Sequence, residues 1–459
     1  MFLVSKDKVK NRKQLEGAAV SVLGAARSGI ALARLLAANG ARVLLSDIKP
    51  VSEWPVDENE LKSQGINYEG GGHSEEVLAS ALICISPGLP LTIPVLQKAQ
   101  QRNIPILGEL EVASWFCPAP IIGITGSNGK TTTTTLTGRI LARKYPAIVA
   151  GNIGSPLAGL VTDARENGLV VVEISSFQLE TIHSFHPGMA VIMNLTPNHL
   201  DRYPSFEAYA EAKLNILKNL TEEDLLIFNR DDEFLSGRLR SVKPRVLQFS
   251  LQKHPYDGAY WEGKEIVLQL EGRSERMRIE KSNLRGPHNR YNMMVAALIG
   301  RLWKVGEEEI IQTIQEFEGI EHRLEFVREL DGVRYFNDSK ATTVDSLGYA
   351  LQSFEEPIVL IAGGKDKGGD FSELNELIRQ KVKKAILIGQ ASGRMAESWQ
   401  RTVPLQKAAT LEEAVQAARN AASAGDVVLL SPACSSFDMF KDYEDRGRVF
   451  KIIVKGLAE

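Results

Sequence analysis

The sequence predicts an α/β protein with three domains, each built on a mostly parallel sheet. Three observations predict this class. Short apolar runs of strand length alternate with helix-like stretches along the chain, and glycine-rich or polar residues follow many of these runs. The chain has 459 residues, of which 44% are hydrophobic, so two to four domains could each bury a core.

Composition narrows the possible functions. The formal net charge of -3 offers no basic surface for nucleic acid, and no run approaches the roughly 18 apolar residues of a membrane span. The first residues lack the apolar core of a secretory signal, so we expect a cytoplasmic protein, and we expect a monomer. The three cysteines, Cys84, Cys117 and Cys434, are too scattered for a disulfide framework or a CxxC metal site, and we expect them to be packing residues.

The first domain is expected over residues 1–114 and opens like a nucleotide-binding βαβ unit. The pattern predicts a strand, a tight turn, a helix and a second strand over residues 19–23, 24–29, 30–38 and 42–46. Asp47 then follows Gly29 by 18 positions, where a carboxylate could bond a ribose hydroxyl. Ala26 stands where the dinucleotide fingerprint has its middle glycine, which disfavours a nicotinamide cofactor. A turn that binds nothing remains the alternative.

The central domain, expected over residues 115–321, begins with a phosphate-binding loop. An apolar strand at residues 121–125 runs into Gly126 and Gly129, and a helix follows. Two glycines let backbone N–H groups turn toward anionic oxygens, and the helix adds its positive N-terminal end. Lys130 can reach the terminal phosphates of a nucleotide, and the Thr131 hydroxyl can bind magnesium. The strict P-loop has four residues between its glycines, whereas this loop has two, Ser127 and Asn128.

Polar residues at later strand ends of this domain predict the rest of the site. Glu173 ends an apolar strand at residues 169–172, where a carboxylate could hold magnesium, although a solvated glutamate is the alternative. His199 lies in a cluster of histidine, aspartate and arginine after another strand, at residues 190–195. A helix is expected over residues 293–303, and Asn289 just before it could be its cap.

The third domain, expected over residues 322–459, repeats the alternation. Three predicted strands, at residues 333–336, 358–362 and 427–430, are each followed by a polar loop. Parallel strands bring such loops to one edge of an open sheet, where ligands bind. A set of merely solvated loops is the alternative.

Four motifs together closely resemble the Mur ligase family. They are Thr-Gly-Ser-Asn-Gly-Lys-Thr-Thr (125–132), Gly-Asn-Ile-Gly (151–154), Glu-Ile-Ser-Ser-Phe-Gln-Leu-Glu (173–180) and Asn-His-Leu-Asp-Arg-Tyr (198–203). The resemblance spans all three expected domains in order. It implies a Rossmann-like N-terminal domain, a central P-loop ATPase-type domain and a Rossmann-like C-terminal domain. In this family the two-residue loop spacing is the normal form.

The resemblance also implies roles for single residues. It implies ATP contacts at Gly126, Ser127, Asn128, Gly129, Lys130, Thr131, Thr132, Asn289, Arg323 and Asp338. It implies substrate contacts at Arg27, Ser28, Asp47, Lys49, Gly88, Asn152, His199, Thr342, Lys367, Ser436, Phe437 and Tyr443. Lys130, His199 and Lys213 are the implied catalytic residues, and Thr131, Glu173 and Lys213 the implied magnesium ligands. Lys213 matches a lysine that such enzymes carbamylate, which would make it an anionic ligand for the second of two magnesium ions.

The chain departs from the family pattern at three of these places. Lys49 stands where an arginine is frequent, so a diphosphate contact there would be a point charge instead of a fork. Thr343 stands where the family has asparagine, and Phe437 where it often has leucine.

The implied reaction joins D-glutamate to UDP-N-acetylmuramoyl-L-alanine and converts ATP to ADP and phosphate, a step of peptidoglycan synthesis. A sister ligase that adds a diamino acid, or a folate polyglutamate synthetase, would share the central motifs. The Ser-Pro-Ala-Cys-Ser-Ser-Phe-Asp loop (431–438) and the uridine-type first domain argue against both. A nicotinamide dehydrogenase and a non-catalytic nucleotide switch are the alternatives from other classes. Ala26 argues against the first, and the polar loops of the third domain argue against the second.

Overall fold

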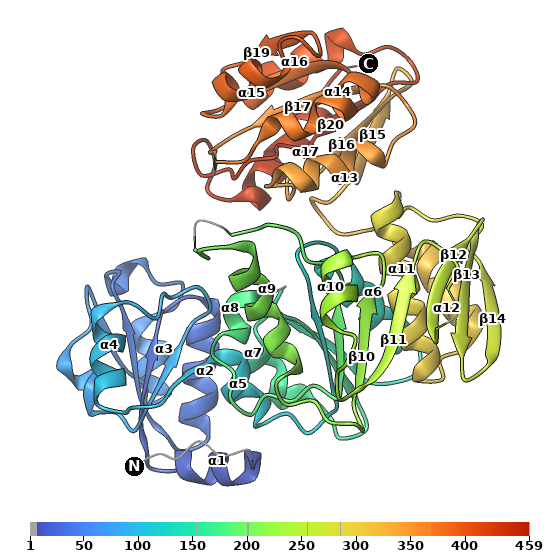
Figure 1. Cartoon of the computed structure of the whole chain (residues 1–459). Helices are drawn as coiled ribbons and strands as arrows, with labels where there is room; N and C mark the ends of the chain where they lie inside the picture. The colour runs from blue at the N-terminus through green and yellow to red at the C-terminus, as the bar shows by residue number, and fades with distance from the viewer. Residues whose placement is uncertain are drawn as a thin grey trace. The chain divides into compact units, whose positions relative to one another are not determined.

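The structure is a computed structural model that describes residues 7–152, 154–199, 202–254, 256–284, 286–366 and 368–458. The described strands form three sheets with helices packed against them (Figure 1). Two compact units result: Met1–Arg278 with Met293–Thr313, and Ile279–Asn292 with Ile314–Glu459. The first unit holds the first two sheets and the second unit holds the third. The predicted α/β class with parallel-rich sheets is confirmed.

The first sheet has the strand order β3-β2-β1-β4-β5, and all its neighbouring strands are parallel. Side chains on its strands alternate between two cores. Leu82 and Cys84 pack with α2, whereas Ile83 and Ile85 pack with α4. The strands are β1 Ala19–Leu23, β2 Arg42–Asp47, β3 Asn67–Gly70, β4 Leu82–Ile85 and β5 Ile106–Gly108. The helices are α1 Lys8–Leu15, α2 Arg27–Ala38, α3 Glu58–Ser63, α4 Pro94–Gln101 and α5 Glu109–Ser114.

The first predicted helix begins earlier than expected, because α2 starts at Arg27 and not at residue 30. Gly29 therefore lies in the first turn of the helix. A Cβ atom there would lie 1.8 Å from the carbonyl oxygen of Gly24, so only glycine allows the helix to start this close to the strand.

The second sheet is larger, with the order β14-β13-β12-β11-β10-β9-β6-β8-β7. Its strands are parallel from β7 to β12, and β13 and β14 are antiparallel additions at the other edge. Glu271 and Gly272, both with positive φ, form the two-residue turn into β14. The strands are β6 Ile121–Thr125, β7 Ala147–Gly151, β8 Leu169–Glu173, β9 Met189–Ile192, β10 Leu225–Asn229, β11 Arg245–Ser250, β12 Gly258–Glu262, β13 Glu265–Leu270 and β14 Arg273–Arg278. The helices are α6 Lys130–Leu141, α7 Leu157–Leu160, α8 Ser176–Leu179, α9 Phe206–Leu214, α10 Glu233–Arg238, α11 Pro287–Leu302 and α12 Glu307–Glu316.

A buried carboxylate fastens the first two domains together within their common unit. Glu111 of α5 accepts hydrogen bonds from the backbone N–H groups of Ser184 and Phe185 and from the indole N–H of Trp115. The Glu111 side chain is completely buried, and these hydrogen bonds satisfy its carboxylate oxygens inside the protein. Helices α2, α5 and α7 also pack on one another along this junction.

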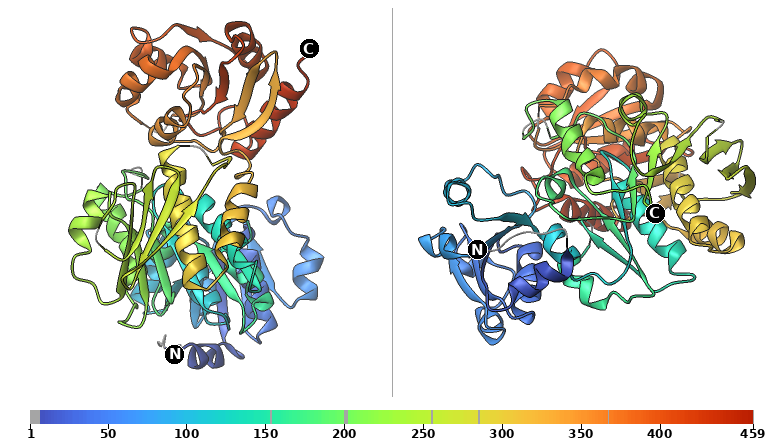
Figure 2. Two further views of the ribbon diagram at one scale, coloured as in Figure 1. Left: turned by 90° about the vertical axis from the view of Figure 1, so that its right-hand side faces the viewer. Right: turned by 60° about the horizontal axis from the view of Figure 1, so that its bottom comes forward.

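The third sheet has the order β15-β16-β20-β17-β18-β19 and helices on both faces (Figure 2). Successive residues of β17 point to opposite cores: Leu360 packs with α13, α14 and α15, whereas Val359 and Ile361 pack with α16 and α17. Only β15 is antiparallel to its neighbour among the described strands of this sheet. The strands are β15 Glu325–Leu330, β16 Val333–Asn337, β17 Ile358–Gly363, β18 Val382–Ile388, β19 Leu405–Lys407 and β20 Val427–Leu430. The helices are α13 Val344–Gln352, α14 Asn375–Lys381, α15 Ser392–Trp399, α16 Leu411–Ala421 and α17 Tyr443–Lys455.

Two general predictions can be compared with this fold. Cys84 and Cys434 are buried and Cys117 is half-buried, and all three are free thiols, as expected for packing residues. Among the described helices, none is long and apolar enough to cross a membrane.

Candidate active site

The glycine loop between β6 and α6 has the backbone geometry of a phosphate cradle. Gly126 and Gly129 have φ values of 141° and 82°, and Gly129 is the residue immediately before α6. A Cβ atom on Gly126 would lie 2.9 Å from Cβ of Met193, so the loop requires glycine there. The Lys130 ammonium donates to the carbonyl oxygens of Gly126 and Ser127 at 2.8 and 3.0 Å, which holds the side chain across the loop.

The segment after β9 supports this loop from behind. The Asn194 side chain accepts a hydrogen bond from the N–H of Asn128 at 2.8 Å and donates to its carbonyl oxygen at 3.1 Å. The Ser127 hydroxyl lies 2.9 Å from the Tyr209 hydroxyl and accepts from the N–H of Thr196. The loop is thus fixed by both α9 and the chain leaving β9.

Glu173 and Lys213 form a buried charged cluster beside the loop. Glu173 is 2% exposed at the end of β8, and its Oε2 atom has no hydrogen-bond partner among the described residues. Lys213 of α9 is also 2% exposed, and its Nζ lies 3.4 Å from Oγ1 of Thr125. Burial, aided by the charge of Lys130, holds the pKa of Lys213 well below its usual range, while Glu173 opposes that shift. An unpaired buried carboxylate oxygen is a natural ligand for a hard cation.

Asn152, after β7, joins this cluster. Its side-chain amide donates to Oε1 of Glu173 at 3.2 Å, and its backbone N–H donates to the Glu173 carbonyl at 2.9 Å. One carboxylate oxygen of Glu173 is therefore hydrogen-bonded to Asn152, and the other is available to a ligand.

The cluster predicted after β9 is arranged around Phe177. The exposed His199 has a φ of 55°, and its ring lies edge-on to Phe177 with centroids 5.0 Å apart. The Arg202 guanidinium lies over the Phe177 ring, 4.4 Å from its centroid, pairs with Glu180, and donates to the carbonyl oxygen of Gly88 at 2.6 Å. The structure therefore brings His199 near Gly88 of the first domain through Arg202, a contact that the sequence did not predict.

The first domain has a cavity of about 510 Å³ at the carboxyl ends of its strands. Gly24, Asp47 and Lys49 line it, together with Leu89, Pro90, Ile93, Pro94 and Val95. The Asp47 carboxylate accepts from the N–H groups of Ala25 at 2.6 Å and Lys49 at 2.9 Å, so it closes the glycine turn as well as facing the cavity. Arg27 and Ser28 lie in the first turn of α2, where Arg27 is exposed.

The three predicted loops of the third domain do meet at one edge of its sheet, because β16, β20 and β17 are neighbours. Asp338 follows β16 and accepts from the Ser431 hydroxyl at 2.8 Å and from the N–H of Leu324 at 3.2 Å. Burial raises its pKa to about 7, although the charge of Arg323 opposes the shift. Thr342, Ser436, Phe437 and Tyr443 lie in or just after these loops, with Ser436 buried and Phe437 66% exposed.

A buried arginine that the sequence reasoning missed holds these loops together. Arg446 of α17 is 1% exposed and donates to the carbonyl oxygens of Ser339 and Cys434 at 2.8 and 3.1 Å, and to the Ser339 hydroxyl at 2.9 Å. Nothing in the sequence indicated the contact with Ser339, because Ser339 lies 107 positions before Arg446.

Comparison with known families agrees with this geometry. The Mur ligase middle domain matches residues 124–300, and the Mur ligase glutamate ligase domain matches residues 322–434. The N-terminal domain of the MurD-like Mur ligases matches residues 18–108.

Full-length relatives decide the family. A UDP-N-acetylmuramoylalanine--D-glutamate ligase of Chlorobaculum parvum is 42% identical over 98% of this chain and 99% of its own length. A protein of the same name from Geotalea daltonii is 44% identical over 97% of this chain and 99% of its own length. The chain belongs to the Mur ligase family.

Solved structures share this Mur ligase fold. A pseudomurein peptide ligase type C from Methanothermus fervidus has a TM-score of 0.61 at 19% identity and covers 96% of this chain and 99% of its own. A UDP-N-acetylmuramate-alanine ligase from Thermotoga maritima has a TM-score of 0.60 at 20% identity and covers 95% and 99%. The predicted three-domain class and the family resemblance are therefore confirmed.

One sequence prediction is wrong, and the structure explains one departure from the family pattern. Asn289 does not precede a helix, because α11 begins at Pro287 and not at residue 293. Proline fits the first helical position, where its missing N–H costs nothing, so the cap interpretation was wrong. Thr343 is the N-cap of α13, and its hydroxyl accepts from the N–H of Ser346 at 3.3 Å. Asparagine is also a good N-cap, which explains how threonine can replace it here. Lys367 lies outside the described residues.

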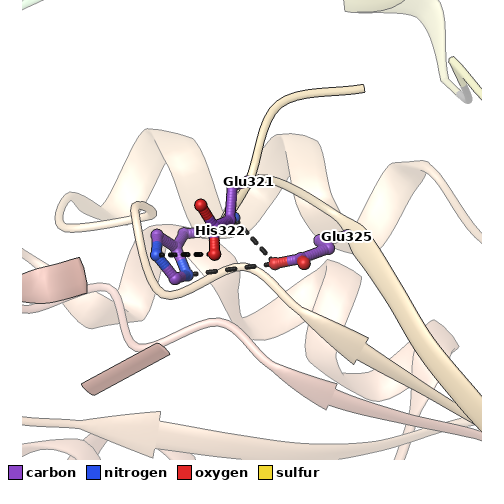
Figure 3. Close-up of side chains that lie close together, drawn as sticks. All are labelled: Glu321, His322 and Glu325. Atoms are coloured by element: carbon purple, nitrogen blue, oxygen red, sulfur yellow. Dashed lines mark hydrogen bonds and ion pairs between the residues drawn. The ribbon is translucent and has the colours of Figure 1, made fainter. Parts of the chain in front are cut away.

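A second carboxylate and histidine group, formed by Glu321, His322 and Glu325, lies at the start of the third domain (Figure 3). Its ligand atoms are close enough together for a metal. The ammonium of Lys451, however, contacts Glu321 at 2.5 Å and Glu325 at 2.9 Å, and so supplies the positive charge that these carboxylates need. We therefore interpret this cluster as an ion-pair network of the fold.

Proposed function

We propose that this chain is an ATP-dependent ligase that joins D-glutamate to UDP-N-acetylmuramoyl-L-alanine and releases ADP and phosphate. The relatives support the choice of substrates, because each carries the name of that ligase and matches this chain over nearly its whole length. The reaction would belong to peptidoglycan synthesis, and its nucleotide substrates favour a cytoplasmic site of action.

The observation that carries the chemistry is the buried Glu173 with its unpaired oxygen beside Lys213 and the glycine loop. A carboxylate is a poor acylating agent, because its oxide leaving group is bad. We propose that the substrate carboxylate attacks the γ-phosphorus of ATP, so that ADP leaves and an acyl phosphate forms. The amine of D-glutamate then attacks the carbonyl carbon, phosphate leaves, and an amide bond results.

In this scheme the chain's own residues bind and orient the reactants. The loop N–H groups and Lys130 would hold the phosphates, which is mainly an electrostatic and positioning task. Thr131 and Glu173 would hold magnesium, which neutralises charge on the transferred phosphoryl group when bound. His199 would position the substrate carboxylate, and Thr342, Ser436 and Lys367 would hold the glutamate carboxylates. Because both substrates would be held next to each other on the protein, the amine and the acyl phosphate would not have to meet by random diffusion.

Lys213 is proposed to be carbamylated. Its lowered pKa favours the neutral amine, the form that adds to the carbon of carbon dioxide with loss of one proton. The resulting anion could bind a second magnesium ion, which an ammonium cannot do. Lys213→Ala should therefore lose activity that added bicarbonate does not restore. Wild-type activity that is independent of carbon dioxide would contradict carbamylation.

Product analysis tests the proposed reaction. The protein is incubated with ATP, magnesium and UDP-N-acetylmuramoyl-L-alanine, and D-glutamate, L-glutamate, L-lysine or meso-diaminopimelate is added separately. Mass spectrometry should detect the amide product only when D-glutamate is the amino acid added. A product with another amino acid would keep the mechanism and change the pathway step. ATP hydrolysis at a rate that is the same with and without every amino acid would favour the nucleotide switch.

A further inference from the structure

Arg202 connects the central domain to the first domain through backbone carbonyl groups. Its Nη1 atom donates to the carbonyl oxygen of Gly88 at 2.6 Å, and its Nη2 atom donates to that of Leu89 at 3.4 Å. Leu89 lines the first-domain cavity, and both segments belong to one compact unit. The Arg202 side chain is 23% exposed, so water competes only partly for these hydrogen bonds. The guanidinium therefore holds one wall of the cavity from the central domain.

The central domain fixes the guanidinium on its other sides. Nη2 of Arg202 pairs with Oε2 of Glu180 at 3.2 Å, and the group lies 4.4 Å from the centroid of the Phe177 ring. The other carboxylate oxygen of Glu180 accepts a hydrogen bond from the hydroxyl of the buried Tyr203. A guanidinium is a rigid fork with five N–H donors, so it can bond two carbonyl groups and a carboxylate at the same time.

The same segment carries His199. The backbone N–H groups of Arg202 and Tyr203 both donate to the His199 carbonyl oxygen, at 2.9 and 3.0 Å. The His199 ring also lies edge-on to Phe177, the ring that the guanidinium covers. Arg202 and His199 thus share a backbone turn and an aromatic support. A change in the contact of Arg202 with Gly88 would therefore change where the cavity wall lies relative to His199.

The proposed reaction needs a fixed separation between these two places. The nucleotide end of the substrate is expected in the first-domain cavity, whereas its reacting carboxylate is expected at His199. A displacement of about 1 Å between reacting groups can reduce a rate by about 100-fold. A side chain that fixes the two places relative to each other can therefore affect the reaction without contacting the substrate.

We propose that Arg202 is a positioning residue that sets the separation between the first-domain cavity and His199, and so places the substrate carboxylate for attack on ATP. This inference rests on the proposed function, because it takes the substrate to extend from the cavity to His199. Arg202 would matter for the whole substrate, which reaches both places, and not for UDP, which occupies the cavity alone.

Two substitutions at Arg202 and one control separate this role from a general one. Arg202→Met keeps an apolar stem against Phe177 and removes every donor, whereas Arg202→Lys keeps one charged donor group but not the fork. Arg276→Met is the matched control, because Arg276 also pairs with glutamates, Glu262 and Glu265, but lies on β14 at the far edge of the second sheet.

Kinetics of the complete reaction and calorimetry with UDP are measured on the full-length proteins. Arg202→Met should lower kcat/KM for UDP-N-acetylmuramoyl-L-alanine by about 10- to 100-fold, because the carboxylate is misplaced. The dissociation constant of UDP and the KM values of ATP and D-glutamate should change by less than about twofold, since those sites do not span the contact. Arg202→Lys should recover part of the lost kcat/KM, and Arg276→Met should match the wild type. Thermal unfolding checks that each variant is folded, and if Arg202→Met does not fold, Arg202→Lys is compared with the wild type in its place.

Unchanged kcat/KM in the folded Arg202 variant would overturn the inference. So would a loss of UDP affinity as large as the loss of kcat/KM, because it would mean that Arg202 only shapes the cavity. A wild-type protein that does not turn over the nucleotide substrate with D-glutamate would instead contradict the proposed function.

Discussion

Single buried charges dominate the chemistry of this chain at the residue scale. Glu173, Lys213 and Asp338 are each less than 5% exposed, and each lies at the end of a strand or on a helix facing the site. Burial shifts the pKa values of Lys213 and Asp338, and it leaves one oxygen of Glu173 available to a ligand. These residues therefore serve binding at some expense of the stability of the unliganded protein.

The destabilising effect of the buried Asp338 can be measured as a dependence of folding stability on pH. Its pKa of about 7 in the folded protein exceeds its ordinary value of 3.8. Between about pH 4 and pH 7 unfolding therefore releases a proton, so the carboxyl group destabilises the folded protein increasingly as pH rises. Asp338→Asn removes this group and keeps a carbonyl acceptor. Without nucleotide, the unfolding midpoint of the wild type should fall more steeply from pH 5 to pH 8 than that of the variant. Parallel pH profiles of the two proteins would show that Asp338 is already ionised at pH 5.

Sequence reasoning found the residues that end apolar strands, because strand ends are visible as a change in polarity. Glu173 was found in this way, whereas Asp338 and Lys213 were singled out only through the family resemblance. Arg446 was missed, because two of its carbonyl partners, Ser339 and Gly363, lie at or just after the ends of strands that are distant in sequence. Nothing in the residues near Arg446 indicates that it bonds carbonyl groups more than 80 positions away.

At the scale of elements, glycine loops between strands and helices position the site. Gly126 combines a φ of 141° with a backbone that packs closely on Met193 and Asn194. The loop and the segment after β9 therefore form one rigid element.

Replacement of Gly126 tests this rigidity. Gly126→Ala must either strain the backbone or move Met193, and should cost about 1–3 kcal/mol of stability with loss of nucleotide binding. Gly237→Ala in α10 is the matched control, because a Cβ there meets nothing within 4 Å and its φ is not positive. The control should be neutral or more stable by about 0.5–1 kcal/mol. Chemical unfolding and nucleotide titration of both variants check the prediction, and equal behaviour of the two would contradict it.

The sequence predicted β1 and β2 of the first sheet and β16, β17 and β20 of the third, since short apolar runs bounded by glycine or polar residues mark strands buried on both faces. The antiparallel strands β13 and β14 at the edge of the second sheet were not predicted. Strand β14, with the sequence Arg-Ser-Glu-Arg-Met-Arg, is mostly exposed and charged, so it lacks the apolar pattern of a buried strand. Helix α11 began six residues before its expected start, because a glycine and a proline suggested a loop.

At the scale of the whole molecule, three sheets supply different parts of one proposed reaction. The first would hold the nucleotide of the substrate, the second ATP and the third the amino acid. The limits proposed for these domains, after residues 114 and 321, remain predictions.

This division predicts a conformational change. ATP contacts are expected from both the glycine loop and Arg323 with Asp338, so we expect the third domain to close when nucleotide and substrates bind. Small-angle X-ray scattering should show a smaller radius of gyration with ATP analogue, magnesium and UDP-N-acetylmuramoyl-L-alanine than without them. Profiles that superimpose would remove domain closure from the mechanism.

The central claim is that ATP is consumed only to join D-glutamate to the nucleotide substrate. Its most direct test is phosphate release from ATP and magnesium, measured with both substrates, with each one alone, and with L-glutamate in place of D-glutamate. We predict phosphate release that requires UDP-N-acetylmuramoyl-L-alanine and D-glutamate together, in equal amount to the amide product. Release at the same rate without D-glutamate, or with L-glutamate in its place, would contradict the claim.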